Sequence, residues 1–265
     1  MKRAFFYALE RILFWGLVPY ICVWGMQGKE VAVSKRYLEL EDLVVYSLMY
    51  QIPKEYEWEV VKAQAVIART NLYKEGKTAG ACVKDGDVIL REVPDQVYRD
   101  AVRETKDLVL FFGTELKYLP YHERSNGRTR DGKEVFREEQ YAYLKSVESL
   151  WDREQDCENV YVKKADFPEG LVIEERDRAG YVMGLQSEEQ IFEGMAFSAG
   201  FGLPSSDFVL EEQGEWICVQ CRGRGHGLGM SQYGGNEMAK EGKDFEEILS
   251  WYFPEGSLNY KGIVS

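Results

Sequence analysis

The chain has 265 residues and a formal net charge of -12, and hydrophobic residues make up 45% of it. This length and composition allow a large apolar core, which excludes a disordered polypeptide and fits one large domain or two closely packed lobes. The acidic balance argues against a sequence-independent nucleic-acid binder, because such binding depends on lysine and arginine side chains that neutralise phosphates, so we expect no nucleic-acid partner.

The first thirty residues differ from the rest in composition. Lys2 and Arg3 precede an apolar run from Ile12 to Met26, which is the order of charge and apolar residues in a secretory signal or a membrane anchor. Because no small-x-small cleavage site is found, we expect an uncleaved single-pass anchor over residues 1–30, with the remaining chain outside the cytoplasm. The alternative is an unusually apolar first helix that is buried in the body.

The next segments predict two consecutive helices. The first covers about Glu41–Tyr50 and ends before Pro53, because proline disfavours helical geometry in the residue before it. The second begins just after Pro53 and reaches Tyr73, where apolar residues recur at helical spacing: Trp58, Val61, Ala65, Ala68 and Leu72. This helix is either a rigid support that displays polar groups to a ligand, or an ordinary amphipathic core helix with solvated charges.

A helix, a hairpin and a polar loop follow. Pro94-Asp95 predicts the start of the helix, and Leu108–Phe112 and Leu116–Leu119 read as the two strands of the hairpin. The hairpin leads into a polar loop, Tyr121–Thr129, which either binds a polar ligand or is a solvated surface loop. From Ser146 to Gln213 the pattern fits short strands and turns.

The cysteines do not form a tidy disulfide framework. Cys218 and Cys221 have the C-x-x-C spacing of half a zinc site or of a redox pair, but no second pair follows. They lie in a strand-like run, and residues three apart on a strand point to opposite faces, so we expect no metal there. A redox or metal enzyme built on these two cysteines is one candidate function class. The remaining cysteines are Cys22, Cys82 and Cys157.

The stretch Arg222–Gly234 is rich in alternating glycines, which let the backbone adopt positive φ and approach a ligand or another segment closely. It lacks the spacing of phosphate-binding and dinucleotide-binding loops, so we expect no nucleotide and no other cofactor. Within it, His226 is either a general base or a packing histidine. Helices are expected around Asn236–Lys240 and over Asp244–Tyr252.

Two of these stretches together resemble the stage II sporulation protein D and LytB family of bacterial peptidoglycan-active proteins. Glu59–Thr70, EVVKAQAVIART, is similar to the first signature of that family, and Gly225–Gly234, GHGLGMSQYG, is similar to the second. Shorter segments also fit, and the resemblance spans about Leu43–Pro254. These segments are the polar loop His122–Thr129, the L-x-S-S match Leu203–Ser206 and the closing helix at Glu247–Leu249.

The resemblance implies a lytic transglycosylase that cleaves denuded glycan strands during forespore engulfment. It also implies a membrane-anchored complex with a peptidoglycan amidase. The fold we expect is α+β, with helices and short strands in one large body or two intimate lobes around a glycan-binding cleft. The lobes would cover residues 31–145, with the first signature and the polar loop, and residues 146–265, with the second signature and the closing helix.

The expected catalytic acid is absent. In the family, a glutamate in an E-M-P triplet protonates the glycosidic oxygen and then, as a carboxylate, helps the 6-hydroxyl of the sugar to attack. Here the triplet is Gln51-Ile52-Pro53, and an amide cannot deliver that proton. Ser198 stands where the family more usually has an arginine. Two function classes follow: an active enzyme that uses another carboxylate, such as Glu55 or Glu57, and a glycan-binding or scaffolding relative without catalysis.

The substrate-binding residues expected beside Gln51 come from the signatures and the polar loop. They are Lys62, Gln64, Arg69, His122, Ser125, Arg128, His226, Ser231, Gln232 and Tyr233. A local basic set would suit the lactyl carboxylate of muramic acid despite the acidic total charge. This set consists of Lys62, Arg69, Arg128, Arg222 and Arg224.

Overall fold

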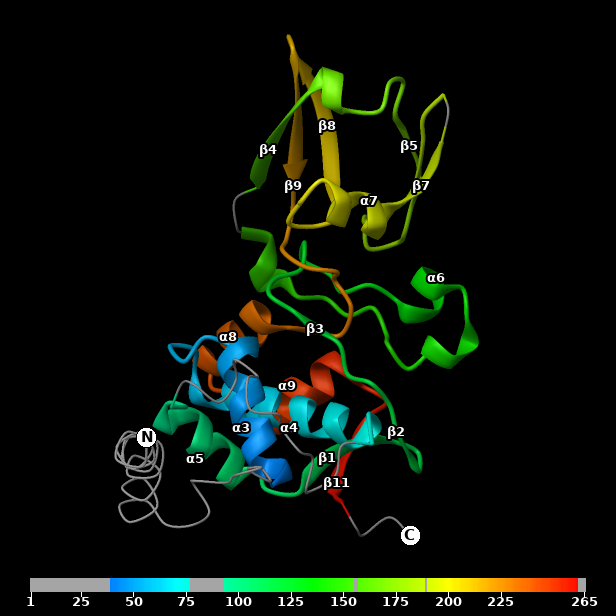
Figure 1. The fold of residues 1–265 in the computed structure, drawn as a ribbon. Coiled ribbons are helices and arrows are strands. Elements are labelled where there is room, and N and C mark those ends of the chain that lie inside the picture. Colours follow the sequence, from blue (N-terminus) through cyan, green and yellow to red (C-terminus); the bar gives the residue numbers. More distant parts are fainter. Residues whose placement is uncertain (1–38, 77–92, 155–156, 189, 262–265) are drawn as a thin grey trace, which may run out of the picture. The chain divides into compact units, whose positions relative to one another are not determined.

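The computed structural model describes residues 39–76, 93–154, 157–188 and 190–261. The predicted anchor over residues 1–30 lies outside the described residues, as do Cys22 and Cys82. Helices and strands are both abundant, which confirms the α+β class (Figure 1). In the described part of the chain, no helix is both long enough and apolar enough to span a bilayer.

The first helices agree with the sequence prediction except at one boundary. Helices α3 (Leu40–Gln51) and α5 (Gln96–Glu104) lie where they are expected, and the side chain of Asp95 caps α5 by accepting from Val97 N. Helix α4 (Trp58–Lys74) begins five residues after Pro53, not directly after it. The intervening residues form a turn, in which the amide of Glu57 donates to Asn236 Oδ1 at 2.8 Å. The helix start is thereby delayed by a contact from α8, far away in the sequence.

Helix α4 is buried on nearly all sides. It packs against α3, α5, α8, α9 and β1, so residues from Val60 to Leu72 are buried except for Lys62. Both Gln64 and Arg69 are completely buried. Helix α4 therefore does not display Gln64 and Arg69 at a surface, because neighbouring elements cover them.

The hairpin is present with its first strand as predicted, but its second strand covers Glu115–Leu116 and not Leu116–Leu119. Strands β1 (Leu108–Phe112) and β2 (Glu115–Leu116) are antiparallel, with Phe112 opposite Glu115, and Gly113 has a φ of +62° in the turn between them. Strand β11 (Ser257–Tyr260) pairs with the other edge of β1. The polar loop begins with β3 (Tyr121–His122), which pairs in parallel with β10 (Met230–Ser231).

The C-terminal helices are α8 (Gln232–Lys240) and α9 (Phe245–Tyr252). Helix α8 begins four residues before the predicted start at Asn236, because Ser231 caps it by accepting from Gly234 N at 3.1 Å. Helix α9 begins with a capping box between Asp244 and Glu247. Both helices pack on α4, and together with α3, α5 and β1 they enclose the larger apolar cluster.

The stretch from residue 146 to residue 213, which the sequence indicates only as short strands, contributes to two sheets, one of which is completed by β9 at Trp216–Cys221. Sheet order is β4-β9-β8 in one and β5-β6-β7 in the other, all antiparallel. A smaller apolar cluster fills this region and includes Cys221 but not Cys218, as expected for a strand. The elements are α6 (Gly132–Phe136), β4 (Glu158–Lys163), β5 (Val172–Arg176), β6 (Val182–Gln186), β7 (Ile191–Glu193), α7 (Gly194–Gly200), β8 (Phe208–Gln213) and β9 (Trp216–Cys221).

Candidate functional site

The position of Gln51 is fixed by two other glutamines, and we call these three residues the glutamine cluster. Gln64 Nε2 on α4 donates to Gln51 Oε1 at 3.0 Å, and Gln232 Nε2 on α8 donates to the backbone oxygen of Gln51 at 2.6 Å. Gln232 Nε2 also lies 3.2 Å from Gln64 Oε1. Gln51 is half-buried and the other two are buried. The fold thus brings Gln51 together with one glutamine from each signature segment.

A buried carboxylate, Asp152, joins the polar loop to the second signature segment. Ser125 donates to Asp152 Oδ2 from its amide at 3.0 Å and from its hydroxyl, and Ser231 Oγ donates to Oδ1 at 3.1 Å. Burial raises the pKa of Asp152, and the hydroxyl hydrogen bonds oppose that rise. Asp152 is only 3% exposed, so it holds the two serines in place and does not reach a ligand. No motif surrounds Asp152, so the sequence gives no signal for its role.

The two predicted histidines lie side by side, with ring centroids 5.7 Å apart. His122 is buried, and its Nδ1 donates to the backbone oxygen of Leu228 at 3.0 Å. His122 Nε2 is then a buried acceptor, and it has no hydrogen-bond partner among the described residues. His226 is exposed, and its Nδ1 accepts from the amide of Leu228 at 3.1 Å. The surrounding protein and nearby Arg130 lower the pKa of His226, so both rings are neutral near pH 7.

Neutral His122 should make the stability of the fold depend on pH. Burial, with a smaller contribution from His226, lowers the pKa of His122 from 6.5 to about 3. This stabilisation is complete above the unfolded-state pKa and is lost as pH falls towards the folded-state value, because the unfolded chain then binds the extra proton. We expect the titration of this group to lower the free energy of unfolding by about 2 kcal/mol from pH 7 to pH 5.

Urea unfolding of the protein and of His122→Asn at both pH values measures this contribution. Asparagine keeps a donor for Leu228 O but does not titrate, so the loss between pH 7 and pH 5 should be smaller for the variant by about that amount. An equal loss in both proteins would contradict the assignment of a neutral, buried His122.

The glycine-rich segment packs against the polar loop. Gly229 has a φ of +69°, and a Cβ atom there would lie 2.0 Å from Pro120 O. Gly225 has a φ of +105°, and its Cβ would lie 2.7 Å from His122 Cβ. The glycines therefore permit close approach to another segment of the same chain, which keeps β10 in register with β3. Between the two possibilities that the sequence leaves open, the structure favours this one over a ligand.

Arg69, predicted to bind substrate, is a core residue. Its guanidinium donates to both carboxylate oxygens of Glu41, at 2.9 and 2.7 Å, and to the backbone oxygens of Val102 and Leu108. Its side chain is completely buried, so it stabilises the packing of α4 and cannot contact a ligand at the surface. These contacts do not support the predicted role of Arg69 in substrate binding, and they show that packing can account for a signature residue.

Lys62 and Arg128 also form ion pairs outside the glutamine cluster. Lys62 Nζ lies 2.8 Å from a carboxylate oxygen of Glu59 and 5.0 Å from the centre of the Phe245 ring, so it faces α9. Arg128 Nη2 lies 2.6 Å from Glu148 Oε1. Their roles in substrate binding remain predictions that these contacts do not support. Arg224, from the basic set, pairs with Glu158 and with Glu123.

Ser198 and the alternative carboxylates have separate positions. Ser198 is buried on α7, where its hydroxyl donates to Gly194 O at 2.9 Å. Glu55 and Glu57 are exposed in the turn after Gln51. Glu59 accepts from the amide of Phe245 at 3.0 Å and also pairs with Lys62, so its carboxylate already has two partners within the protein.

Tyr56 lies in the turn that follows Gln51 along the chain. Tyr56 is half-buried, and burial followed by the charges of Glu123 and then Tyr233 raises its pKa. Tyr233 is also half-buried, and its amide donates to Glu123 O at 2.9 Å. The side chains of Gln51, Tyr56 and Tyr233 are all partly exposed. Partly exposed amide and phenol groups can hydrogen-bond a neutral, hydroxyl-rich ligand.

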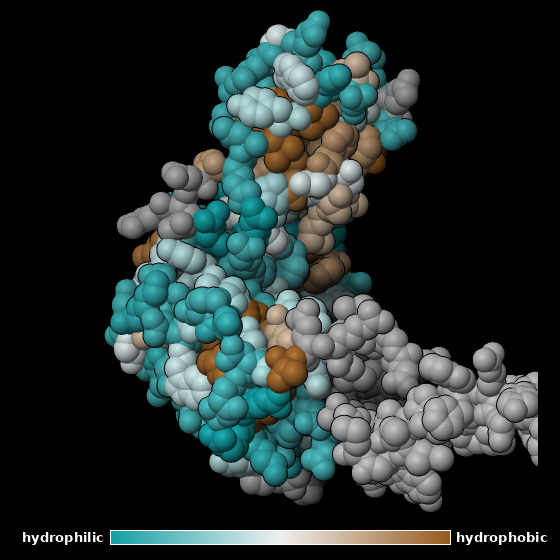
Figure 2. Space-filling view, turned by 60° about the vertical axis from the view of Figure 1, so that its left-hand side comes forward, coloured by the Kyte–Doolittle hydropathy of each residue, from teal (hydrophilic) through white to brown (hydrophobic). Residues whose placement is uncertain are grey.

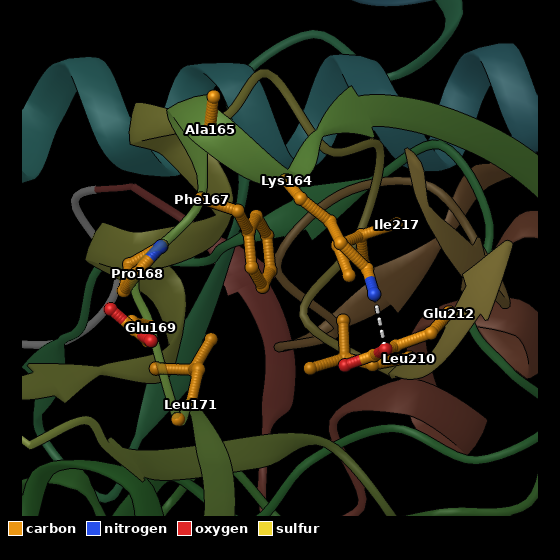
Figure 3. A pocket seen from close by; sticks show the side chains of 10 residues that line it. Lys164, Ala165, Phe167, Pro168, Glu169, Leu171, Leu210, Glu212 and Ile217 are labelled. Carbon is orange, nitrogen blue, oxygen red and sulfur yellow. Dashed lines mark hydrogen bonds and ion pairs between the residues drawn. The ribbon is translucent and has the colours of Figure 1, made fainter. Parts of the chain in front are cut away.

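A separate cavity of about 490 Å³ lies in the region of β4 to β9 and contains none of the predicted site residues (Figure 3). Phe167, Leu171, Leu210 and Ile217 line it, and an ion pair between Lys164 and Glu212 borders it. Hydrophobic side chains also reach the surface of this region, in the upper part of Figure 2. Cys221 in the adjacent sheet is a free thiol whose pKa burial raises to about 12, so it is no nucleophile at neutral pH.

Comparisons with known proteins agree with the resemblance seen in the signatures. A family model described as "Stage II sporulation protein" (SpoIID) matches residues 28–112, which include Gln51 and Gln64. Stage II sporulation protein D of Bacillus subtilis is 28% identical over 83% of this chain and 74% of its own length. The protein of the same name from Bacillus amyloliquefaciens is 27% identical over the same shares.

A third relative is more distant. An uncharacterized protein of Brachyspira hyodysenteriae is 24% identical, over 82% of this chain and 65% of its own length. The matches to the two Bacillus proteins extend over most of the chain, well beyond the segment that the family model covers. This chain is similar to stage II sporulation protein D over most of its length and matches the model of that family at residues 28–112, which indicates a role related to sporulation.

Proposed function

We propose that this protein binds peptidoglycan glycan strands at the glutamine cluster during sporulation and does not cleave them. The proposal rests on Gln51, an amide that Gln64 holds in place and that, by the family resemblance, occupies the position of the acid needed for lytic cleavage. An amide can donate to and accept from the acetamido and hydroxyl groups of a sugar. Loss of the acid therefore removes the chemistry and leaves the means of recognition.

The carboxylates near the cluster offer no clear replacement for the acid. Asp152 has a raised pKa, as a general acid should, but it is buried and accepts hydrogen bonds from two serines. Glu59 is held by Phe245 and Lys62. Of Glu55, Glu57 and Glu59, only Glu55 and Glu57 are exposed, and both lie in the turn after Gln51. An active enzyme that uses one of them is the alternative that the experiment below must exclude.

We further propose that the protein is anchored in the cell membrane. Residues 1–30 would anchor the chain in the membrane and the described body would lie outside the cytoplasm, where glycan strands are found. The charge and apolar pattern of these residues supports this placement. A membrane-anchored complex with a peptidoglycan amidase would supply strands without stem peptides, and this partner is proposed from the family resemblance alone.

Incubation of the full-length protein with denuded glycan strands tests the proposal. We expect the strands to be retained, and mass spectrometry to find no 1,6-anhydro ends. Gln51→Leu should weaken retention about tenfold, the equivalent of one lost hydrogen bond, because leucine cannot bond a sugar. The matched control is Gln186→Leu, at an exposed glutamine on β6 outside the cluster. Cleavage by the native protein would show that another carboxylate is catalytic, and equal retention by both variants would place the binding surface elsewhere.

A further inference from the structure

A pocket of about 440 Å³ is lined by five arginines, although the whole chain carries a net charge of -12. The polar loop, the β5–β6 turn and the segments at Asp207 and Arg222 contribute its walls. Asp207 is the one carboxylate among its lining residues. We call this the arginine pocket, and its arginines are Arg128, Arg153, Arg176, Arg178 and Arg222.

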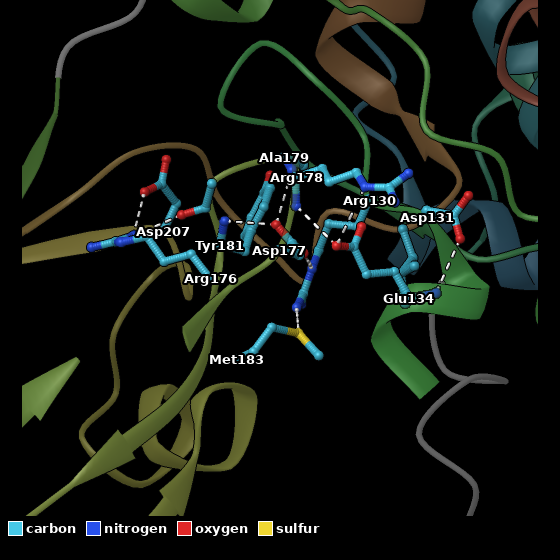
Figure 4. Close-up of polar contacts among 12 residues, drawn as sticks. Arg130, Asp131, Glu134, Arg176, Asp177, Arg178, Ala179, Tyr181, Met183 and Asp207 are labelled. Atoms are coloured by element: carbon cyan, nitrogen blue, oxygen red, sulfur yellow. Dashed lines mark hydrogen bonds and ion pairs between the residues drawn. The ribbon is translucent and has the colours of Figure 1, made fainter. Parts of the chain in front are cut away.

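One of these arginines is part of the framework of the pocket. Arg176 donates to the backbone oxygens of Gly180 at 2.7 Å and Phe208 at 2.6 Å, and it lies 3.4 Å from Asp207 Oδ1 (Figure 4). Asp207 Oδ2 in turn accepts from Asn126 Nδ2 at 2.8 Å. These bonds fix one wall of the pocket and occupy its single carboxylate.

The remaining arginines form fewer hydrogen bonds and ion pairs within the protein. Arg153 and Arg222 are exposed, and in the described part of the chain neither side chain forms a hydrogen bond or an ion pair. Arg178 is 90% exposed and lies 4.0 Å from its nearest carboxylate partner, Glu134. Arg128 pairs with Glu148. Even if Asp207 and both of these glutamates are counted against the five arginines, the pocket keeps a positive charge.

The pocket holds more guanidinium groups than carboxylates, which is unfavourable because like charges repel one another. An anion in the pocket would relieve that repulsion. The planar fork of a guanidinium group matches a carboxylate or a phosphate through paired N–H···O bonds. The volume is within the range of pockets that bind small organic molecules, so it can hold more than one inorganic ion.

We propose that the arginine pocket binds a small organic oxyanion, through Arg153 and Arg222 as the principal contacts. The shared ligand chemistry is a carboxylate or phosphate group on a small molecule, and anionic sugars serve as its probes. This site is separate from the glutamine cluster and does not depend on the function proposed for it. Strand binding at Gln51 and anion binding at Arg222 can therefore fail independently of each other.

Isothermal titration calorimetry of the full-length protein tests the proposal with three probes. N-acetylmuramic acid carries a carboxylate, glucosamine 6-phosphate carries a phosphate, and N-acetylglucosamine is the neutral comparison. We expect at least one anionic sugar to bind and the neutral sugar to bind at least tenfold more weakly. Arg222→Gln and Arg153→Gln should each reduce the affinity for that anionic sugar about tenfold or more, as expected for a lost charge-assisted hydrogen bond.

The matched control is Arg103→Gln, at an exposed arginine of α5 outside the pocket, which removes the same charge. Preference for N-acetylmuramic acid would identify the carboxylate as the ligand group, and preference for glucosamine 6-phosphate would identify the phosphate. The proposal is overturned if neither anionic sugar binds better than the neutral one. It is also overturned if Arg222→Gln and Arg103→Gln have the same affinity.

Discussion

Gln51→Glu should give this protein the ability to cleave denuded glycan strands and to leave 1,6-anhydro ends. A positioned acid contributes about 10²–10⁴-fold to a rate, so the variant should exceed the native protein by at least two orders of magnitude. The change replaces one amide nitrogen by oxygen and adds no volume. The expected result is therefore a gain of chemistry in a site that is otherwise unchanged.

The glutamine cluster can accommodate a glutamate. Gln64 Nε2 donates to Gln51 Oε1 at 3.0 Å, and a carboxylate oxygen can accept the same bond. Gln232 bonds the backbone oxygen of residue 51, so it stays in place whatever the side chain. Partial burial of residue 51 should raise the pKa of the new carboxyl, as a general acid requires, and the hydrogen bond from Gln64 opposes that rise.

The matched control is Gln186→Glu, which makes the same chemical change at an exposed position on β6. It should remain inactive. A Gln51→Glu variant that binds strands as well as the native protein but yields no anhydro ends would contradict the proposed role of this position. If the native protein already cleaves, the acid must be sought at Glu55 and Glu57.

The elements that the sequence predicts well are those whose signals are local. The stripe of α4 and the turn residues of the β1–β2 hairpin are encoded within short windows, and so is the cap of α9. The start of α4 is not local, because the amide of Glu57 bonds Asn236. Burial of Gln64 and Arg69 is likewise set by distant segments that cover the helix.

Some residues of the candidate site could likewise be predicted from the sequence, and others could not. Signature residues Gln64 and Gln232 could be named from motifs, and the structure brings both to Gln51. Asp152 and the arginine pocket could not be predicted from the sequence. Their residues are scattered through stretches without periodicity or motif. Division of the body near residue 146 stays a prediction. The larger apolar cluster already combines α3 to α5 with α8 and α9, and a boundary read along the chain cannot express that packing.

A buried ion pair connects the polar loop to the β5–β6 turn. Arg130 Nε donates to Asp177 Oδ2 at 2.5 Å, and both side chains are almost completely buried (Figure 4). The guanidinium carbon lies 4.9 Å from the centre of the Tyr181 ring, and Nη1 donates to the backbone oxygen of His226. This pair therefore holds the polar loop, the turn and the glycine-rich segment together.

Arg130→Leu should reduce the free energy of unfolding by about 3–5 kcal/mol, because it leaves the Asp177 carboxylate buried without its partner. The comparison is Arg103→Leu, which breaks an ion pair with Asp100 at 2.7 Å on the surface of α5. An exposed pair of this kind contributes about 0–1 kcal/mol. Urea unfolding of the two variants measures the difference between a buried and an exposed arginine in the same chain.

A second substitution separates the buried charge from the lost packing. Asp177 Oδ1 accepts from the amides of Ala179 at 3.1 Å and Tyr181 at 2.9 Å, and the side-chain oxygen of asparagine can keep both bonds. Adding Asp177→Asn to Arg130→Leu should therefore restore part of the lost stability, because no charge is then buried alone. If the double variant is no more stable than Arg130→Leu, the cost of that substitution comes from packing against Tyr181 and not from the unpaired carboxylate.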